Sequence, residues 1–144
     1  MEKKEVYFDS CIWLNLFKQE GDETKGVPYW KLAQECVERI EKVGGTIFVS
    51  TIVLKELYFQ LGPKFELVNK FFKQSAFVKI VKTANEDYLL ARAFEQKHQT
   101  LSFYDYLHVA LAKRLNVSLI TRDTELMEFA KSQVEVHKPE ELIR

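Results

Sequence analysis

Several features that often direct a function are scarce in this sequence. It holds two cysteines, five glycines and three prolines among 144 residues. Cys11 and Cys36 have neither the spacing of a metal site nor that of a disulfide framework, so we expect reduced thiols in a cytoplasmic protein. No apolar run is long enough to cross a bilayer. Asp9 interrupts the apolar stretch near the N-terminus, which argues against a signal peptide.

The chain also lacks net charge, because 21 basic residues balance 21 acidic ones. Long-range attraction to nucleic acid is therefore not encoded in the total, and any such binding must come from local patches. The sequence has no HExxH motif, no paired cysteine–histidine set, no Walker loop, and no nucleophile elbow around Ser10, Ser50 or Ser102. These absences remove the usual signatures of a zinc site, a P-loop and an acyl-transfer enzyme.

What the sequence does contain is a regular alternation of strand and helix patterns within a single domain, 1–144. Hydrophobic residues make up 47% of the chain, which suits one packed core. Strands are expected at 6–8, 46–50, 76–81, 117–121 and 134–137. Helices are expected at 11–18, 30–42, 51–61, 63–72, 85–96 with Asn85 as its cap, 103–115, and after Asp123. The alternation predicts an α/β fold, a three-layer α/β/α sandwich with a mainly parallel central sheet.

Two acidic residues stand where strands end. Asp9 follows the first strand directly, and Asp123 closely follows the fourth, in "LITRD". Ligands of such sheets bind at the carboxyl ends of the strands, so both side chains are expected at the edge where a site forms. Each also has an innocent explanation, because Asp9 and Asp123 can each cap the helix that follows.

Two further acids lie on apolar faces of helices that open from the same edge. Asp105 borders the apolar arc of its helix, where its alternative role is to complement the helix dipole. Glu56 has apolar helical neighbours, and its alternative role is an ion pair with a nearby lysine or arginine. Taken together, four carboxylates favour a hard cation such as Mg²⁺ or Mn²⁺, and an acidic cluster around such an ion suits phosphoryl chemistry.

Four segments carry a family resemblance. "VYFDSCIWLNLF", "STIVLKELYF", "FYDYLHVALAKRLN" and "LITRDTEL" resemble, in order and spacing, the signature segments of PIN-domain ribonucleases, of which VapC-type toxins are small members. The resemblance implies that Asp9, Glu56, Asp105 and Asp123 form an acidic quartet binding Mg²⁺ or Mn²⁺, with Ser10 and Thr121 as supporting residues. Two departures are Cys11, where the family often has a small polar residue, and a longer insertion at 18–30.

The same resemblance implies hydrolysis of phosphodiester bonds in RNA, single-stranded by expectation, together with a homodimer and an antitoxin protein as partner. The basic candidates for RNA contact are Arg122, Lys113 and Arg114. His98, His108 and His137 are scattered and are interpreted as packing or surface residues.

Two rival functions remain. A non-catalytic PIN-like scaffold would bind RNA or a protein without cutting, although loss of acidic ligands is its usual signature. A phosphoacceptor receiver domain would need an aspartate after the third strand, where Lys82 and Thr83 stand.

Overall fold

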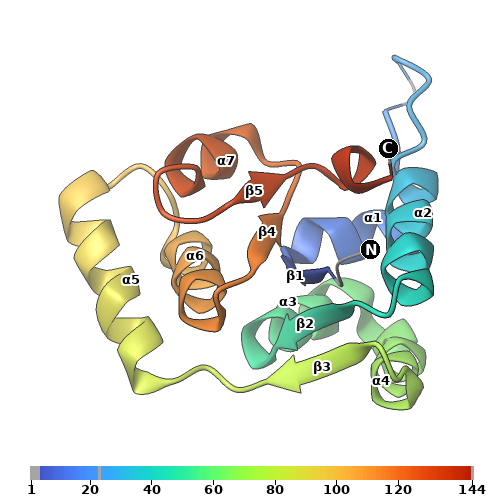
Figure 1. The fold of residues 1–144 in the computed structure, drawn as a ribbon, viewed down its shortest axis with the longest axis horizontal. Coiled ribbons are helices and arrows are strands. Elements are labelled where there is room, and N and C mark those ends of the chain that lie inside the picture. Colours follow the sequence, from blue (N-terminus) through green and yellow to red (C-terminus); the bar gives the residue numbers. More distant parts are fainter. Residues whose placement is uncertain (1–3, 23, 144) are drawn as a thin grey trace.

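A computed structural model describes residues 4–22 and 24–143 and places a parallel sheet at the centre of the chain (Figure 1). The five strands lie in the order β3-β2-β1-β4-β5, and every paired strand is parallel to its neighbour. Their bounds are β1 Glu5–Phe8, β2 Thr46–Ser50, β3 Val78–Val81, β4 Ser118–Ile120 and β5 Val136–His137.

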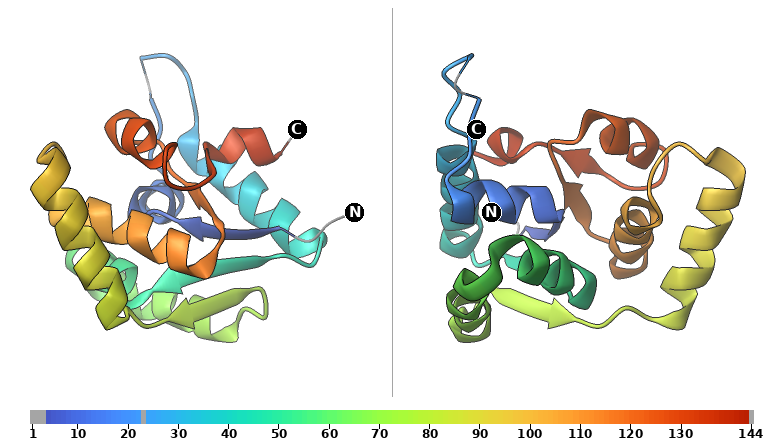
Figure 2. Two further views of the ribbon diagram at one scale, coloured as in Figure 1. Left: turned by 60° about the vertical axis from the view of Figure 1, so that its left-hand side comes forward. Right: turned by 180° about the vertical axis from the view of Figure 1, so that it is seen from behind.

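Helices connect successive strands and cover the sheet. Their bounds are α1 Ser10–Lys18, α2 Tyr29–Lys42, α3 Thr51–Leu61, α4 Phe65–Gln74, α5 Asn85–His98, α6 Phe103–Leu115 and α7 Thr124–Ala130, with short 3₁₀ turns at Gly62–Lys64 and Pro139–Leu142. Seen from behind, α1 and α3 lie over the sheet, while α5 packs on α6 at the periphery (Figure 2). The predicted α/β/α architecture with a mainly parallel sheet is confirmed.

β1 is the central strand, and its residues explain that position. Val6, Tyr7 and Phe8 are fully buried, as expected for a strand covered on both faces. Phe8 lies opposite Ile120 of β4, and Tyr7 lies opposite Phe48 of β2. This register brings the carboxyl ends of β1, β2 and β4 to one edge of the sheet, which positions the segments that follow them.

The structure corrects two predicted helix starts and leaves the predicted architecture unchanged. Asn85 does not cap α5, because the cap position is Ala84, whose N–H is bound at 2.8 Å by the Asp87 carboxylate. The helix predicted from 63 begins with a 3₁₀ turn before α4, in which Pro63 occupies an early position. Within the described ranges, no helix is both long and apolar enough to cross a membrane.

Candidate functional site

The ends of β1 and β4 place Asp9 and Thr121 side by side. The backbone N–H of Asp9 donates to the carbonyl of Ile120 at 3.0 Å, which continues the ladder past the last residue of β1. The Thr121 hydroxyl donates to Asp9 Oδ2 at 2.9 Å and accepts from the backbone N–H of Asp123 at 3.1 Å. Thr121 therefore links the two acidic turns that the sequence placed at this edge.

Asp9 is almost fully buried, with 6% of its surface exposed, and it is held by neutral donors. Besides Thr121, the Cys11 thiol donates to Oδ2 at 3.2 Å, and the Ser10 hydroxyl approaches Oδ1 at 3.5 Å. Burial, reinforced by the charge of Asp9, raises the pKa of the Cys11 thiol far above its usual range, so this thiol stays protonated. Across residues 4–22 and 24–143, no lysine or arginine forms an ion pair with Asp9.

Glu56 reaches the same edge from α3, and its partner is His108 of α6. His108 Nε2 lies 2.8 Å from Glu56 Oε1 and 3.8 Å from Asp9 Oδ1. The His108 side chain is buried, whereas that of Glu56 is 30% exposed. Burial lowers the pKa of His108, but the hydrogen bond to Glu56 and the charges of Asp9, Glu56 and Asp105 together outweigh it and raise that pKa. The alternative considered for Glu56 was an ion pair with a lysine or arginine, and the structure pairs it with a histidine instead.

Asp105 stands in the first turn of α6, one helical turn before His108. It forms a capping box with Ser102, in which the Asp105 N–H donates to the Ser102 hydroxyl and the Ser102 N–H donates to Asp105 Oδ2. Burial raises the pKa of the Asp105 carboxyl, and the charge of Asp9 raises it further against the opposing effect of Ser102. Mutual repulsion between these two carboxylates follows from their placement at one edge.

Asp123 departs from the other three acids. Its carboxylate accepts from the backbone N–H groups of Glu125 and Leu126, at 3.0 and 3.2 Å, and so caps α7. The capping alternative considered for Asp123 is thus its observed role, while Asp9 makes no side-chain cap bond to α1. The structure brings Asp9, Glu56 and Asp105 around His108. Asp123 is joined to Asp9 only through Thr121, whose hydroxyl donates to Asp9 and accepts from the Asp123 backbone N–H.

The donor set suits a hard cation in its chemistry, because Asp9, Glu56 and Asp105 offer only carboxylate oxygens. Asp9 Oδ2 is taken by Thr121 and Cys11, whereas Oδ1 has only long contacts. Nevertheless, in the part of the chain that the structure describes, no three histidine, cysteine or acidic side chains are grouped closely enough to hold a metal ion. The acids lie at one edge but do not form a ready metal site, because Glu56 is hydrogen-bonded to His108 and Asp123 caps α7.

Two of the basic residues considered for RNA contact are already paired. Arg122 is only 13% exposed, binds Glu140 through two nitrogens at 2.8 and 3.1 Å, and lies over the Tyr29 ring at 4.2 Å. Arg114 Nε binds the Asp87 carboxylate at 2.8 and 3.0 Å.

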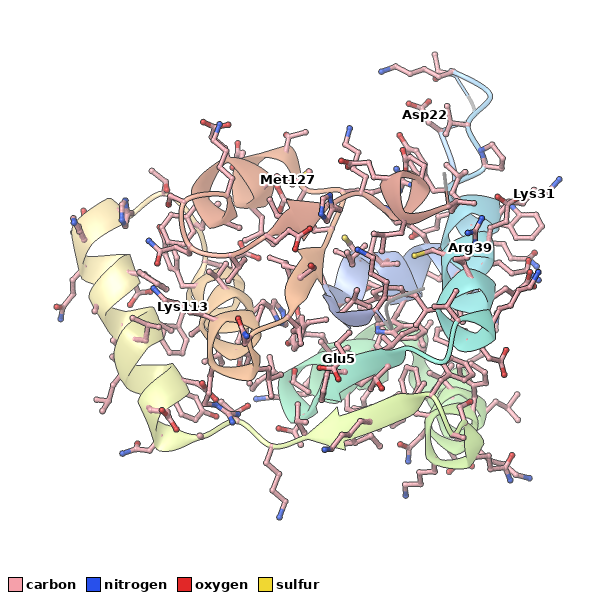
Figure 3. All side chains as sticks on the ribbon, viewed as in Figure 1. Glu5, Asp22, Lys31, Arg39, Lys113 and Met127 are labelled. Carbon is pink, nitrogen blue, oxygen red and sulfur yellow. The ribbon has the colours of Figure 1, made fainter. Side chains whose placement is uncertain are left out.

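Lys113 lies far from the acidic edge. It stands near the end of α6, opposite the Asp105 end, and its ammonium donates to Gln133 at 2.8 Å. Together with Glu5, at the start of β1, it lines a depression of about 630 Å³ near the amino ends of the strands (Figure 3).

His108 is the site residue that sequence reasoning missed. It was interpreted as a packing or surface residue, and it is indeed buried, but it bonds Tyr7 on one side and Glu56 on the other. The available signal was its spacing, because His108 follows Asp105 by three residues and so shares its helical face.

Comparison with known proteins gives a consistent assignment. A sequence model described as "PIN domain" matches residues 6–132. A search among curated proteins finds no match.

Solved structures with a similar fold include three from named bacteria. A toxin–antitoxin complex from Klebsiella pneumoniae has a TM-score of 0.64 at 19% identity, covering 93% of this chain and 97% of that one. VapBC2 from Rickettsia felis, bound to a DNA fragment from its promoter, has a TM-score of 0.66 at 18% identity and coverages of 93% and 98%. FitAcB from Neisseria gonorrhoeae has a TM-score of 0.65 at 18% identity and coverages of 93% and 97%.

Proposed function

The chain belongs to the PIN domain family, and on that premise we propose that it is a metal-dependent ribonuclease that hydrolyses phosphodiester bonds of single-stranded RNA. One observation carries the proposal. Among the residues that the structure describes, Asp9 is buried without a lysine or arginine partner at the carboxyl edge of a parallel sheet, with Glu56 and Asp105 beside it. Buried carboxylates are normally neutralised by a cation, and in this site an external ion would supply that charge.

In the proposed site, Asp9, Glu56, Asp105 and Asp123 hold Mg²⁺ or Mn²⁺. When bound, the ion supplies positive charge beside the scissile phosphate and lowers the pKa of water there. Thr121 fixes Asp9 through Oδ2, so that Oδ1 is the oxygen left for the ion. Ser10 supports the same carboxylate from α1. Asp123 would join the set through its other carboxylate oxygen, because both of its cap bonds to α7 use Oδ1.

Partners form a second part of the proposal. The three similar structures named above include toxin–antitoxin assemblies, and we extend that arrangement to this chain as a toxin held by an antitoxin protein. A homodimer is proposed on the exposed apolar side chains Tyr58, Phe59 and Leu89 of α3 and α5. Sedimentation of the purified chain tests the dimer, since a monomer at all concentrations would contradict it.

One observation favours the alternative of a non-catalytic scaffold that binds RNA or a protein. Glu56 and Asp123 already have partners within the chain, and the described residues hold no preassembled metal group. In that case metal addition would leave RNA intact, and binding would persist without an ion.

A cleavage assay separates the two functions. The full chain is incubated with mixed RNA in Mg²⁺ or Mn²⁺, with and without EDTA, beside Asp9→Asn. Asp22→Asn is the matched control, because Asp22 lies on the loop before α2, where, among the described residues, its carboxylate accepts the N–H of Lys25 and contacts none of the proposed site (Figure 3). We expect wild type and Asp22→Asn to cleave RNA only with metal and Asp9→Asn to fail. Cleavage that EDTA leaves unchanged, or no cleavage with either ion, would contradict the ribonuclease proposal.

A further inference from the structure

A chain of buried polar side chains runs beneath the acidic edge. Tyr7 comes from the middle of β1, Ser50 from the end of β2, and His108 from α6, and each is at most 1% exposed. The Tyr7 hydroxyl lies 2.7 Å from Ser50 Oγ and 2.7 Å from His108 Nδ1. This hydrogen-bonded network ends at Glu56 Oε1, which lies 2.8 Å from His108 Nε2. It therefore connects β1, β2 and α6 to one proposed metal ligand.

The positions of the protons determine which atom donates in each hydrogen bond of this network. Ser50 Oγ accepts from the N–H of Val53 as the cap of α3. The Glu56 carboxylate can only accept, so His108 Nε2 must carry a proton. In the neutral ring Nδ1 is then an acceptor, the Tyr7 hydroxyl donates to it, and the Tyr7 oxygen accepts from Ser50. Every polar atom of the three buried side chains is satisfied by this arrangement.

We propose that His108, held in orientation by Tyr7, is a positioning residue that keeps the Glu56 carboxylate beside Asp9. The proposal rests on the ribonuclease function and names a residue that serves it without touching RNA or the ion. The same Nε2–H faces Glu56 Oε1 at 2.8 Å and Asp9 Oδ1 at 3.8 Å, so one donor lies between two like charges.

The need for such a donor follows from the surroundings of Glu56. Its side chain is 30% exposed, and in the described residues its side-chain hydrogen bond is to His108. Repulsion from Asp9 favours rotamers of Glu56 that swing away toward solvent. A hydrogen bond to a ring fixed by Tyr7 opposes that swing, in the way that outer partners of metal ligands fix their orientation.

A merely structural role makes a different prediction. If the network only satisfied buried polar atoms, its removal would lower stability and leave ion binding by the folded protein unchanged. The two roles separate when ion affinity and stability are measured on the same variants.

The test titrates Mn²⁺ into the full chain by calorimetry and follows unfolding by circular dichroism. His108→Leu removes the donor, Tyr7→Phe removes only the hydroxyl that orients it, and His108→Gln keeps an N–H near the position of Nε2. Tyr106→Phe is the matched control for Tyr7→Phe, because Tyr106 is equally buried and its hydroxyl binds the backbone N–H groups of Thr100 and Leu101 instead of His108.

We expect Mn²⁺ affinity to fall by about 10- to 100-fold in His108→Leu and by less in Tyr7→Phe, following the usual effect of losing an outer partner. His108→Gln should restore most of the loss, and Tyr106→Phe should lower stability with unchanged affinity. Wild-type affinity in folded His108→Leu would overturn the proposal, as would wild-type affinity in Tyr7→Phe if His108→Leu fails to fold.

If the proposed ribonuclease function is wrong, the binding and cleavage measurements give a different set of results. Wild type that binds Mn²⁺ but cleaves no RNA would reject the nuclease while the affinity series still decides the role of His108. Wild type that binds no Mn²⁺ would overturn both.

Discussion

Two buried aspartates in this chain show opposite solutions to the same physical problem. Asp87 in the first turn of α5 is 1% exposed and meets Arg114 Nε at 2.8 and 3.0 Å, while a backbone N–H binds it at 2.8 Å. Asp9 is 6% exposed and meets a hydroxyl, a thiol and a more distant imidazole. Asp87 is neutralised by Arg114 within the fold, whereas in the proposed function a metal ion neutralises Asp9.

The difference teaches how to interpret a buried carboxylate. A cation partner from the same chain indicates a structural role, here the joining of α5 to α6. Neutral donors at the edge of a parallel sheet, with other acids nearby, favour a functional site. In the proposed function, a bound cation offsets the repulsion between these carboxylates. The substitutions below are arranged by the size of the effect that this contrast predicts.

The largest effect concerns activity. Asp9→Asn should reduce metal-dependent RNA cleavage by about a thousandfold, equal to about 4 kcal/mol of lost transition-state stabilisation at 1.36 kcal/mol per factor of ten. Cleavage rates of the folded wild type and variant, measured at the same Mn²⁺ concentration that saturates wild type, check this value. A variant with near-normal rates would remove Asp9 from the site.

The next effect concerns stability. Asp87→Asn should lower the free energy of unfolding by about 3 kcal/mol, because it breaks a buried ion pair; the value is at the low end of the usual range since Arg114 is partly exposed. Urea unfolding followed by circular dichroism measures it. If Asp87→Asn costs no more stability than Asp9→Asn, the contrast between the two aspartates does not hold.

A smaller effect concerns Glu140, which pairs with Arg122. Burial alone would raise the pKa of Glu140, but the hydrogen bonds and charge of Arg122 lower it overall. The stability that this carboxylate contributes is therefore present above its ordinary pKa and is lost as pH falls through the lowered value. Glu140→Gln should cost about 1 kcal/mol at neutral pH and nothing in acid. Urea unfolding across that pH range should show the two curves converging.

The smallest predicted effect is a gain in the free energy of unfolding, whereas the two preceding stability effects are losses. The raised pKa of Asp105 means that its contribution to stability is fully present below the ordinary pKa of an aspartate and is lost as pH rises through the raised value. Without metal, Asp105→Asn should therefore raise the free energy of unfolding at neutral pH by about 0.5 kcal/mol, a gain that fades on acidification. A loss of stability at neutral pH would contradict the repulsion inferred between Asp105 and Asp9.

The sequence was sufficient for the architecture because its signals were local. Each of these signals involves a few neighbouring residues. They are the apolar run before Asp9, the serine caps of α3 and α6, and the alternation of strand-like and helix-like hydrophobic patterns. The parallel topology then follows from the crossover rule, and it places Asp9 and Thr121 at one edge. The contact between these two residues was thus within reach of sequence reasoning.

The missed features depend on distant partners. His108 gains its meaning from Tyr7, 101 residues away, and from Glu56, 52 residues away. Arg122 adjoins the acidic turn in sequence, yet Glu140 holds it. The role of Asp123 could not be decided from sequence because a carboxylate suits both a helix cap and a metal ligand. Side-chain pairing across the fold, which no local pattern encodes, decides the cases of His108 and Arg122, whereas local cap bonds decide that of Asp123.

Calorimetric titration of Mn²⁺ into wild type, Asp9→Asn and Asp87→Asn tests the contrast most directly. We expect wild type and folded Asp87→Asn to bind the ion with equal affinity and Asp9→Asn to show no binding heat. Equal binding by Asp9→Asn, or no binding by wild type, would contradict the claim that the charge of Asp9 is reserved for a metal ion.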